Sequence, residues 1–348
     1  MIIGACSFGS TGSSAVTDYL CEFGNIQVLD QLEFTWVSDV DGLIDLEYHL
    51  FHPHNRTLDS IVAINRYRQK AKTLLHLYEK GGGIDSRVFM DSVNRFLDAI
   101  TQVKWYWDYD YSNNFFEKNI RRVTDRIIPW MEAKHGRPIN CWPMKEVSLS
   151  VLPSNFEVAA RQHVKELLIA MGADFSKPII LDQPFAGNNP QACFKFFEDP
   201  YAIVVDRDPR DNYVFANTRL LGGNHFMAAS PVEDFVKYYK ALRDNQPYKQ
   251  ESERVMHIQF EDMVYNYEET TLKIRNFFHL GDNPAPKSIF DPAISMPNTQ
   301  VWKRFPQYAK DIEYIEQQLQ DYLFDYSNCP EPDVNGKMFY GKSPKNKR

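Results

Sequence analysis

MIIGACSFGSTGSSAVTDYL, residues 1–20 of the chain, is the stretch that decides the fold. It opens with the apolar run Met1–Ala5, passes through a cluster of Gly, Ser and Thr, and continues with apolar residues at helical spacing. A buried strand, a turn of small residues and a helix N-terminus in this order form an anion cradle, because backbone N–H groups and the helix dipole converge there. An ordinary glycine–serine turn is the alternative interpretation. We expect the cradle, with phosphate as its occupant.

Two registers fit the loop in this stretch. In one, residues 4–11 match G-x-x-x-x-G-K-[ST], with serine standing where nucleotide hydrolases have lysine. In the other, which fits better, glycine makes the tight turn at position 12 and two serines open the helix. We expect phosphate contacts from the residues that the two registers cover between them, which are Gly9, Ser10, Thr11, Gly12, Ser13 and Ser14.

The composition limits the class of protein and its compartment. The chain has 348 residues, of which 43% are hydrophobic and 24% charged, as is typical of a soluble globular protein. The formal charge of −7 argues against a nucleic-acid partner, and no apolar run approaches a membrane span in length. The five cysteines are scattered without C-x-x-C spacing, so we expect reduced thiols. Because no basic region precedes the first apolar run, we also expect a cytoplasmic protein.

Short apolar runs separated by helical patterns predict the rest of the sheet. After the first helix such runs recur at residues 26–29, 179–181, 201–205 and 255–260. This spacing indicates a three-layer, P-loop-type α/β fold, in which a parallel sheet is flanked by helices. We predict one domain over residues 1–330, with residues 47–172 as a large helical insert and residues 331–348 as a flexible basic tail. Within the insert, residues 58–79 and 86–103 have the longest helical patterns.

Charged residues that follow the predicted strands are candidates for chemistry. Ligands of parallel sheets bind beyond the carboxyl ends of the strands, so Glu33, after the second strand, is a candidate general base. A solvated loop carboxylate is the alternative. Arg207 and Arg210 follow the strand at 201–205, and their guanidinium groups suit a phosphate ligand. Pairing with the neighbouring aspartates is the alternative for these two arginines.

Aromatic residues gather in the predicted insert, which we expect to bind the acceptor. The densest stretch, residues 105–111, contains Trp105, Trp107 and Tyr109. Aromatic faces beside carboxylates suit sugar rings or aromatic acceptors, and packing within a core is the alternative. The three histidines between residues 49 and 54 lack an i, i+4 pair with an acidic partner, so we predict no metal site.

Four separated pieces together resemble the PAPS-dependent sulfotransferase superfamily, and their pattern is most similar to its bacterial and carbohydrate sulfotransferases. Residues 12–14 are similar to the G-[TS]-[TS] of the family's 5′-phosphosulfate loop. Residues 201–214, YAIVVDRDPRDNYV, are similar to its 3′-phosphate motif, an apolar strand followed by R-[DN]-P-[RK]-D. Residues 257–263, HIQFEDM, are similar to its strand ending in [YF]-E-D. Residues 298–305, NTQVWKRF, are similar to the closing loop of bacterial members.

The resemblance implies a transferase that moves a sulfuryl group from 3′-phosphoadenosine 5′-phosphosulfate (PAPS) to an acceptor. The acceptor would be a hydroxyl, or an amine, of a carbohydrate or another small molecule, and no metal is implied. The loop at residues 9–14 would hold the 5′-phosphosulfate, and Arg207 the 3′-phosphate. Glu33 and Lys303 would act in catalysis. The resemblance also implies that PAPS is contacted by five further residues, which are Arg210, Asn217, Trp302, Lys303 and Arg304.

Three positions depart from the family's pattern. Ser10 replaces the basic residue that stabilises the leaving phosphate, and Phe215 stands where a serine contacts the 3′-phosphate. Residues 182–183, Asp-Gln, stand where many members have a basic residue. Two alternatives follow: a P-loop phosphotransferase or kinase, which the missing lysine disfavours, and a catalytically weak relative that binds only nucleotide or partners.

Overall fold

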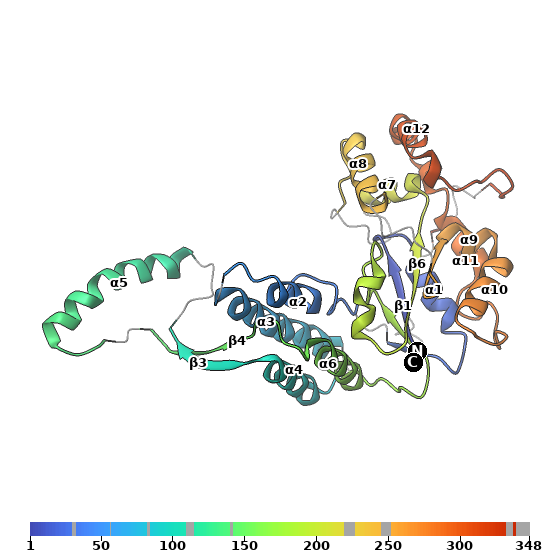
Figure 1. The fold of residues 1–348 in the computed structure, drawn as a ribbon. Helices are drawn as coiled ribbons and strands as arrows, with labels where there is room; N and C mark the ends of the chain where they lie inside the picture. The colour runs from blue at the N-terminus through green and yellow to red at the C-terminus, as the bar shows by residue number, and fades with distance from the viewer. Residues whose placement is uncertain are drawn as a thin grey trace. The chain divides into compact units, whose positions relative to one another are not determined.

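The computed structural model describes residues 1–29, 33–55, 57–81, 84–108, 115–139, 142–218, 227–244, 252–331 and 337–338. The chain forms two compact units (Figure 1): Met1–Ser38 with Leu168–Arg348 form the first, and Asp39–Leu167 the second. The insert expected at residues 47–172 overlaps the second unit. The expected tail, residues 331–348, lies almost entirely outside the described residues.

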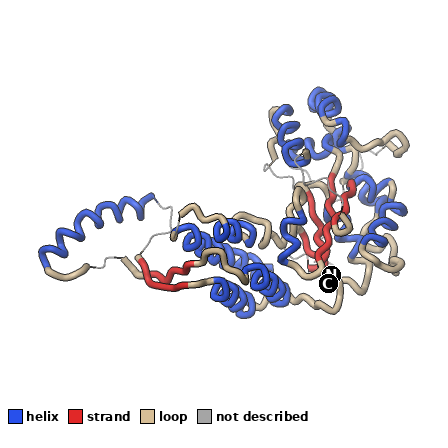
Figure 2. Tube along the Cα trace, in the orientation of Figure 1, coloured by secondary structure: helices blue, strands red, loops and turns tan. Residues whose placement is uncertain are grey.

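The first unit is built on a sheet that lies between helices (Figures 1 and 2). Its five strands lie in the order β2-β5-β1-β6-β7. Every pair of neighbouring strands is parallel, which confirms the predicted α/β class with a parallel sheet flanked by helices. Because β1 is the central strand, the loop that follows it opens at the middle of the sheet's carboxyl edge. The strands are β1 (Ile2–Ser7), β2 (Gln27–Leu29), β5 (Ile179–Asp182), β6 (Pro200–Asp206) and β7 (Val255–Gln259).

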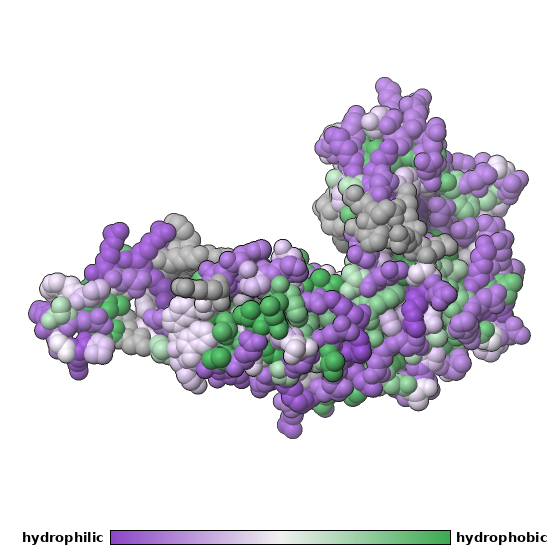
Figure 3. All heavy atoms as spheres, in the orientation of Figure 1, coloured by the Kyte–Doolittle hydropathy of each residue, from purple (hydrophilic) through white to green (hydrophobic). Residues whose placement is uncertain are grey.

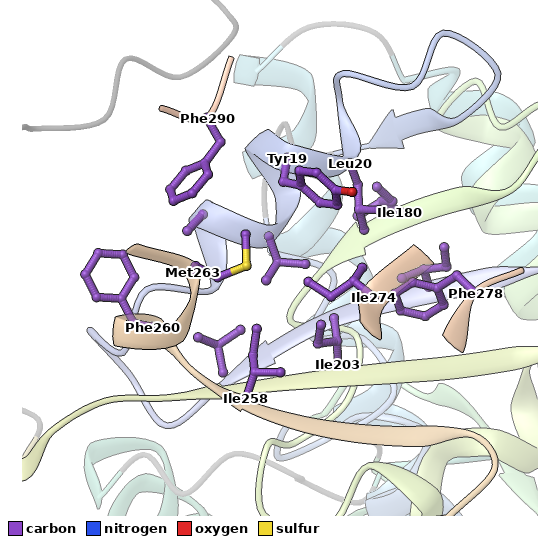
Figure 4. Close-up of a cluster of buried hydrophobic side chains, with 14 of the residues drawn as sticks. Tyr19, Leu20, Ile180, Ile203, Ile258, Phe260, Met263, Ile274, Phe278 and Phe290 are labelled. Carbon is purple, nitrogen blue, oxygen red and sulfur yellow. The ribbon is translucent and has the colours of Figure 1, made fainter. Parts of the chain in front are cut away.

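Helices α1 (Ser13–Leu20), α9 (Phe260–Tyr265) and α10 (Tyr267–Phe277) cover one face of this sheet (Figure 1). Their apolar side chains meet those of four strands in one buried cluster (Figure 4), which includes Ile3, Ile180, Ile203, Ile258, Tyr19, Met263, Ile274 and Phe278. The run Ala202–Val205 of β6 is completely buried. A strand covered on both faces needs a continuous apolar run, and this is why the run at residues 201–205 was readable in the sequence.

Residues that follow β5 cover the opposite face. A Cβ added at Gly4 of β1 would lie 2.5 Å from the ring of Phe185, so this layer approaches the strand closely. The helices of the first unit are α1 (Ser13–Leu20), η1 (Pro190–Phe196), α7 (Pro209–Thr218), α8 (Val232–Arg243), α9 (Phe260–Tyr265), α10 (Tyr267–Phe277), α11 (Pro292–Ser295), η3 (Met296–Asn298), η4 (Val301–Arg304), η5 (Pro306–Tyr308), α12 (Ala309–Gln318) and η6 (Gln320–Tyr322), where η marks a 3-10 helix.

The second unit combines helices with an antiparallel hairpin. The patterns at residues 58–79 and 86–103 correspond to α3 and α4, but α4 ends at Ile100 and Val103 begins a strand. The insert was predicted to be helical, but it also contains a hairpin. The reason is that β-branched and aromatic residues make the sequence VKWYW a strand. The elements are α2 (Leu43–Phe51), α3 (Leu58–Gly81), α4 (Ser86–Ile100), β3 (Val103–Trp107), α5 (Phe115–His135), β4 (Lys145–Leu149) and α6 (Phe156–Ala170), whose last residues lie in the first unit.

Hydrophilic residues dominate the face of the molecule shown in Figure 3, and apolar residues gather mainly over the second unit. Exposed apolar side chains of that unit include Leu77, Val103 and Val158. Among the described helices, none combines the length and the apolar character that a membrane crossing requires.

A buried histidine lies in the core of the second unit. His163 of α6 is 1% exposed, and its ring stacks on Phe96 with 4.8 Å between centroids. Its Nδ1 lies 2.7 Å from the hydroxyl of Ser92, and its Nε2 lies 2.8 Å from the hydroxyl of Tyr67. Burial disfavours the charged ring and lowers the pKa of His163 to about 3.

We expect His163 to make folding pH-dependent. Below the usual histidine pKa of 6.5 the unfolded chain binds a proton that the folded chain does not. The free energy of unfolding should therefore fall as the pH drops from 6.5 towards about 3, by up to about 1.4 kcal/mol per pH unit. Urea titrations of the full chain over this range should show a flatter pH dependence for His163→Gln. His76→Gln, which changes an exposed histidine of α3, is the matched control. Equal pH dependence in wild type and His163→Gln would contradict this explanation.

Candidate functional site

A pocket of about 690 Å³ lies over the carboxyl edge of the sheet in the first unit. It is lined by residues 7–14 after β1, by Glu33 after β2, and by Asp182 and Gln183 at the end of β5. These residues follow three neighbouring strands, which is where open parallel sheets bind ligands. A second pocket of about 580 Å³ runs along β7 and α10 and includes none of the predicted site residues. The first pocket is the candidate site.

The backbone of the loop after β1 takes left-handed conformations. Gly9 and Ser10 have φ of 88° and 54°, and Gly12, the N-cap of α1, has φ of 94°. Left-handed residues next to right-handed ones turn successive N–H groups to one side and form an anion-binding nest. Among the described residues no side chain caps the N-terminus of α1, so its first N–H groups are also available to a ligand.

Two buried side chains hold the carbonyl groups of this loop. Asn212 Nδ2 donates to the carbonyl of Gly9 and Arg207 Nη1 to the carbonyl of Ser10, each at 3.3 Å. In a trans peptide the N–H of the next residue points the opposite way from the carbonyl. The N–H groups of Ser10 and Thr11 therefore point away from Asn212 and Arg207. No described residue accepts a hydrogen bond from the N–H groups of residues 10–14.

The loop side chains divide between the fold and the pocket. The Thr11 hydroxyl is buried, donates to the carbonyl of Val205 at 2.5 Å and accepts from the N–H of Phe8 at 3.3 Å. Ser13 Oγ accepts from Gln183 Nε2 at 3.1 Å, and Ser7 Oγ accepts from the same amide at 2.7 Å. Thr11 therefore fixes the loop to β6, while the serine hydroxyls remain at the pocket.

Two carboxylates line the pocket with the loop. Glu33 is exposed, and the structure places it in the pocket that the sequence led us to expect. Its chain is fixed to β5, because the N–H of the next residue, Phe34, donates to the carbonyl of Asp182 at 2.7 Å. The side chain of Asp182 also lines the pocket, so two carboxylates, not one, are candidates for a base.

Arg207 lies beneath the loop and does not line the pocket. Its side chain is 4% exposed, and its guanidinium lies 4.3 Å from the ring centre of Phe215 and 4.6 Å from that of Phe260. Besides the carbonyl of Ser10, it donates to the carbonyl of Asn298. The structure thus brings Arg207 to the loop, on the side of the Ser10 carbonyl.

Arg210 is held on the other side of the same turn. It pairs with Asp208 at 2.7 Å and Glu316 at 2.8 Å, and its guanidinium stacks on Trp302 at 4.1 Å. Like Arg207, it is absent from the lining of the pocket. The pairing with neighbouring acidic residues, which the sequence left open as an alternative, is present for this arginine.

Two buried carboxyl groups accompany Arg207. Burial raises the pKa of Asp211 to about 7 and that of Glu261 to about 8, and the charge of Arg207 opposes both shifts. Asp211 Oδ2 lies 4.0 Å from Arg207 Nε, and its Oδ1 accepts the N–H groups of Val301 and Trp302. Asp211 therefore links Arg207 to the segment that begins at Val301.

The remaining residues that we predicted to contact PAPS do not line the pocket. Trp302 packs on Arg210, Lys303 pairs with Glu331 at 2.7 Å, and Arg304 donates to the carbonyl of Pro297 at 3.0 Å. Asn217 donates to the carbonyl of Tyr213 at 2.9 Å. That these four residues contact PAPS stays a prediction.

The predicted acceptor residues belong to the second unit. Trp105 and Trp107 lie on β3 with 6.4 Å between ring centroids, and both are partly exposed. Tyr109 lies outside the described residues. Across the part of the chain that the structure describes, no group of three His, Cys, Asp or Glu residues could hold a metal ion.

Sequence reasoning missed the residues that shape the loop. Gln183 ties β5 to both serines, and its Oε1 accepts the N–H of Ser7 at 3.1 Å. Its position at a strand's carboxyl end was the available signal. Asn212 gave no such signal, because its position on α7 faces the loop only after β1 and β6 have paired.

Comparisons with known proteins add little to this geometry. The chain is similar to the structure of the sulfotransferase domain from the Synechococcus PCC 7002 olefin synthase, with a TM-score of 0.36 and 12% identity. The alignment covers 87% of this chain and 86% of that domain. No family model and no curated protein matches the chain. A likeness at this level establishes neither family nor activity, so the function has to come from the site.

We expect Gly12→Ala to destabilise the first unit more than Gly172→Ala. Both glycines have a left-handed φ, of 94° and 89°, which costs an alanine about 1–2 kcal/mol. Only at Gly12 would the new Cβ also collide, at 2.6 Å from the Phe260 ring, so we expect a total loss of about 3 kcal/mol there. Urea unfolding of the two variants measures the difference. Equal losses would mean that the loop can move away from Phe260.

Proposed function

We propose that this chain transfers a sulfuryl group from PAPS to a hydroxyl, or an amine, of a carbohydrate or another small acceptor. The observation that carries the proposal is the set of backbone N–H groups at residues 10–14, which have no described acceptor and lie in one pocket with Glu33. Such a set suits the 5′-phosphosulfate of the donor. The resemblance of four sequence pieces to the sulfotransferase superfamily supplies the chemical class.

The proposed reaction needs three functions from the pocket. The N–H groups of residues 10–14 and the N-terminus of α1 hold the phosphosulfate in line with the acceptor. Glu33 accepts the proton of the acceptor hydroxyl as its oxygen attacks the sulfur. The bond between sulfur and the bridging phosphate oxygen breaks, and the products are a sulfate ester and 3′,5′-ADP.

Charge on the leaving phosphate has to be met without a lysine in the loop. Ser10 stands at that position, and the described lining of the pocket includes no lysine or arginine. Preorganised N–H groups perform this task in oxyanion holes, where one donor contributes about 3–4 kcal/mol to the transition state. We therefore propose that backbone donors stabilise the leaving group. The catalytic role predicted for Lys303 remains open to test by substitution.

Ligand stabilisation distinguishes this proposal from a kinase. We expect 3′,5′-ADP to raise the melting temperature of the protein, because a ligand at about 100 times its Kd adds about 2.7 kcal/mol to the folded state. ATP with Mg²⁺ should have little effect, because no lysine of the kinase type stands in the loop. Thermal shift measures both ligands on the same sample. The reverse ranking would favour the phosphotransferase alternative.

Substitution of the two carboxylates in the pocket tests the base. We expect Glu33→Gln to lower kcat by about 10²–10⁴ and to leave the affinity for 3′,5′-ADP nearly unchanged. Asp182→Asn is the matched control, because it removes a charge from the same pocket. Initial rates of transfer to a panel of sugars, with PAPS as donor, measure kcat. A full loss in Asp182→Asn with an active Glu33→Gln would assign the base to Asp182.

A further inference from the structure

We infer that Arg207 is a positioning residue that fixes the phosphosulfate loop, and not a ligand of the donor's 3′-phosphate. The inference deepens the proposed function and rests on it for the identity of the ligand. It changes the role that the sequence resemblance gives to this residue. The contacts of the guanidinium, its surroundings and its effect on the loop support it in turn.

Both terminal nitrogens of the Arg207 guanidinium are engaged by the fold. Its two terminal nitrogens donate to the carbonyls of Ser10 and Asn298, which belong to segments far apart in the sequence. Rings of Phe215 and Phe260 lie within 4.6 Å of its central carbon. To reach a phosphate in solution, the side chain would have to break both hydrogen bonds and leave both rings. A guanidinium in this setting acts as a clamp between two segments.

The charge of Arg207 is partly compensated inside the protein. Asp211 Oδ2 lies 4.0 Å from its Nε, and neither atom has a hydrogen-bond partner among the described residues. Glu261, completely buried, adds a second carboxyl group to the same cluster, since it accepts the N–H of Asp208 at 3.3 Å. A buried cation needs a compensating partner, and ionised Asp211 provides one without a ligand, whereas the raised pKa of Glu261 keeps that group largely protonated at neutral pH.

Phe215 supports the same assignment. In the family's pattern a serine at this position contacts the 3′-phosphate together with the arginine. In this chain the position holds a completely buried aromatic ring that stacks on Arg207. A phenylalanine offers no hydrogen bond to a phosphate, but it does stabilise a guanidinium through its ring. The pair therefore packs the interior beneath the loop.

The clamp sets the direction of the N–H groups in the loop. Arg207 holds the carbonyl of Ser10, so the N–H of Thr11 points to the opposite side, away from the guanidinium. Asn212 does the same for the carbonyl of Gly9 and the N–H of Ser10. Removing the guanidinium would free the peptide after Ser10 to rotate. The loop that would hold the 5′-phosphosulfate would then lose its fixed conformation, while no contact to the 3′-phosphate would be lost.

Two ligands that differ only in the 3′-phosphate test the inference. Calorimetric titration with 5′-AMP and with 3′,5′-ADP gives the affinity of each for wild type, Arg207→Lys and Arg207→Gln. We expect Arg207→Gln to lower the affinity for both nucleotides by the same factor, about 10-fold or more. The ratio of the two affinities then stays that of wild type. Arg207→Lys, which keeps one donor, should lose less. A selective loss for 3′,5′-ADP would overturn the inference, because it would show contact with the 3′-phosphate.

A control and a second measurement separate the possible failures. Glu22→Gln weakens a buried carboxylate that accepts the N–H groups of Ile289 and Phe290, so it destabilises the same unit without touching the loop. It should leave both affinities unchanged. If wild type binds neither nucleotide, the proposed function fails. The clamp is then read from amide chemical shifts of residues 9–12 in the free protein, which Arg207→Gln should move and Glu22→Gln should not. Unmoved shifts in Arg207→Gln would overturn the clamp.

Discussion

The arrangement of the site depends on how the backbone polar groups of one loop are satisfied. Buried side chains accept or donate wherever the loop faces the interior: Arg207 and Asn212 hold two carbonyls, and Thr11 reaches the carbonyl of Val205. The N–H groups of residues 10–14 have no acceptor among the described residues. A backbone donor without a partner is costly unless water or a ligand reaches it. The loop is therefore fixed in a conformation that suits an anion before any anion arrives.

The interior beneath the loop is unusually charged for a protein core. Arg207, Arg210, Asp208, Asp211 and Glu261 are all at most 9% exposed. Removing such groups from water is expensive, and mutual pairing offsets the cost only where the geometry is good. Their aromatic neighbours exclude water and hold each guanidinium in one orientation. We interpret this cluster as the rigid support of the loop. Its side chains bond to the backbone of Ser10 in the loop and to the backbone of Asn298 and Val301.

The sequence predicted those features that depend on local pattern. The strand, loop and helix at residues 1–20 and the buried run at 201–205 were readable because each has its own apolar period. Glu33 could be placed at the pocket, since strand ends share one edge of a parallel sheet. The direction of Arg207 could not be predicted, because a guanidinium after a strand can turn towards solvent or towards the interior. The partner of β3 was also hidden, because a whole helix separates the two strands in sequence.

The interrupted first unit has a consequence for the order of folding. Strand β1 pairs only with Ile179–Asp182 and Pro200–Asp206, which follow the complete second unit in the chain. During synthesis the second unit, being continuous, can fold while β1 still lacks both neighbours. Closing the sheet then requires contacts of high sequence separation, which form slowly. Throughout this interval the apolar side chains of β1 are unpaired and able to aggregate. We therefore expect chaperones to bind the six residues of β1 rather than the inserted unit.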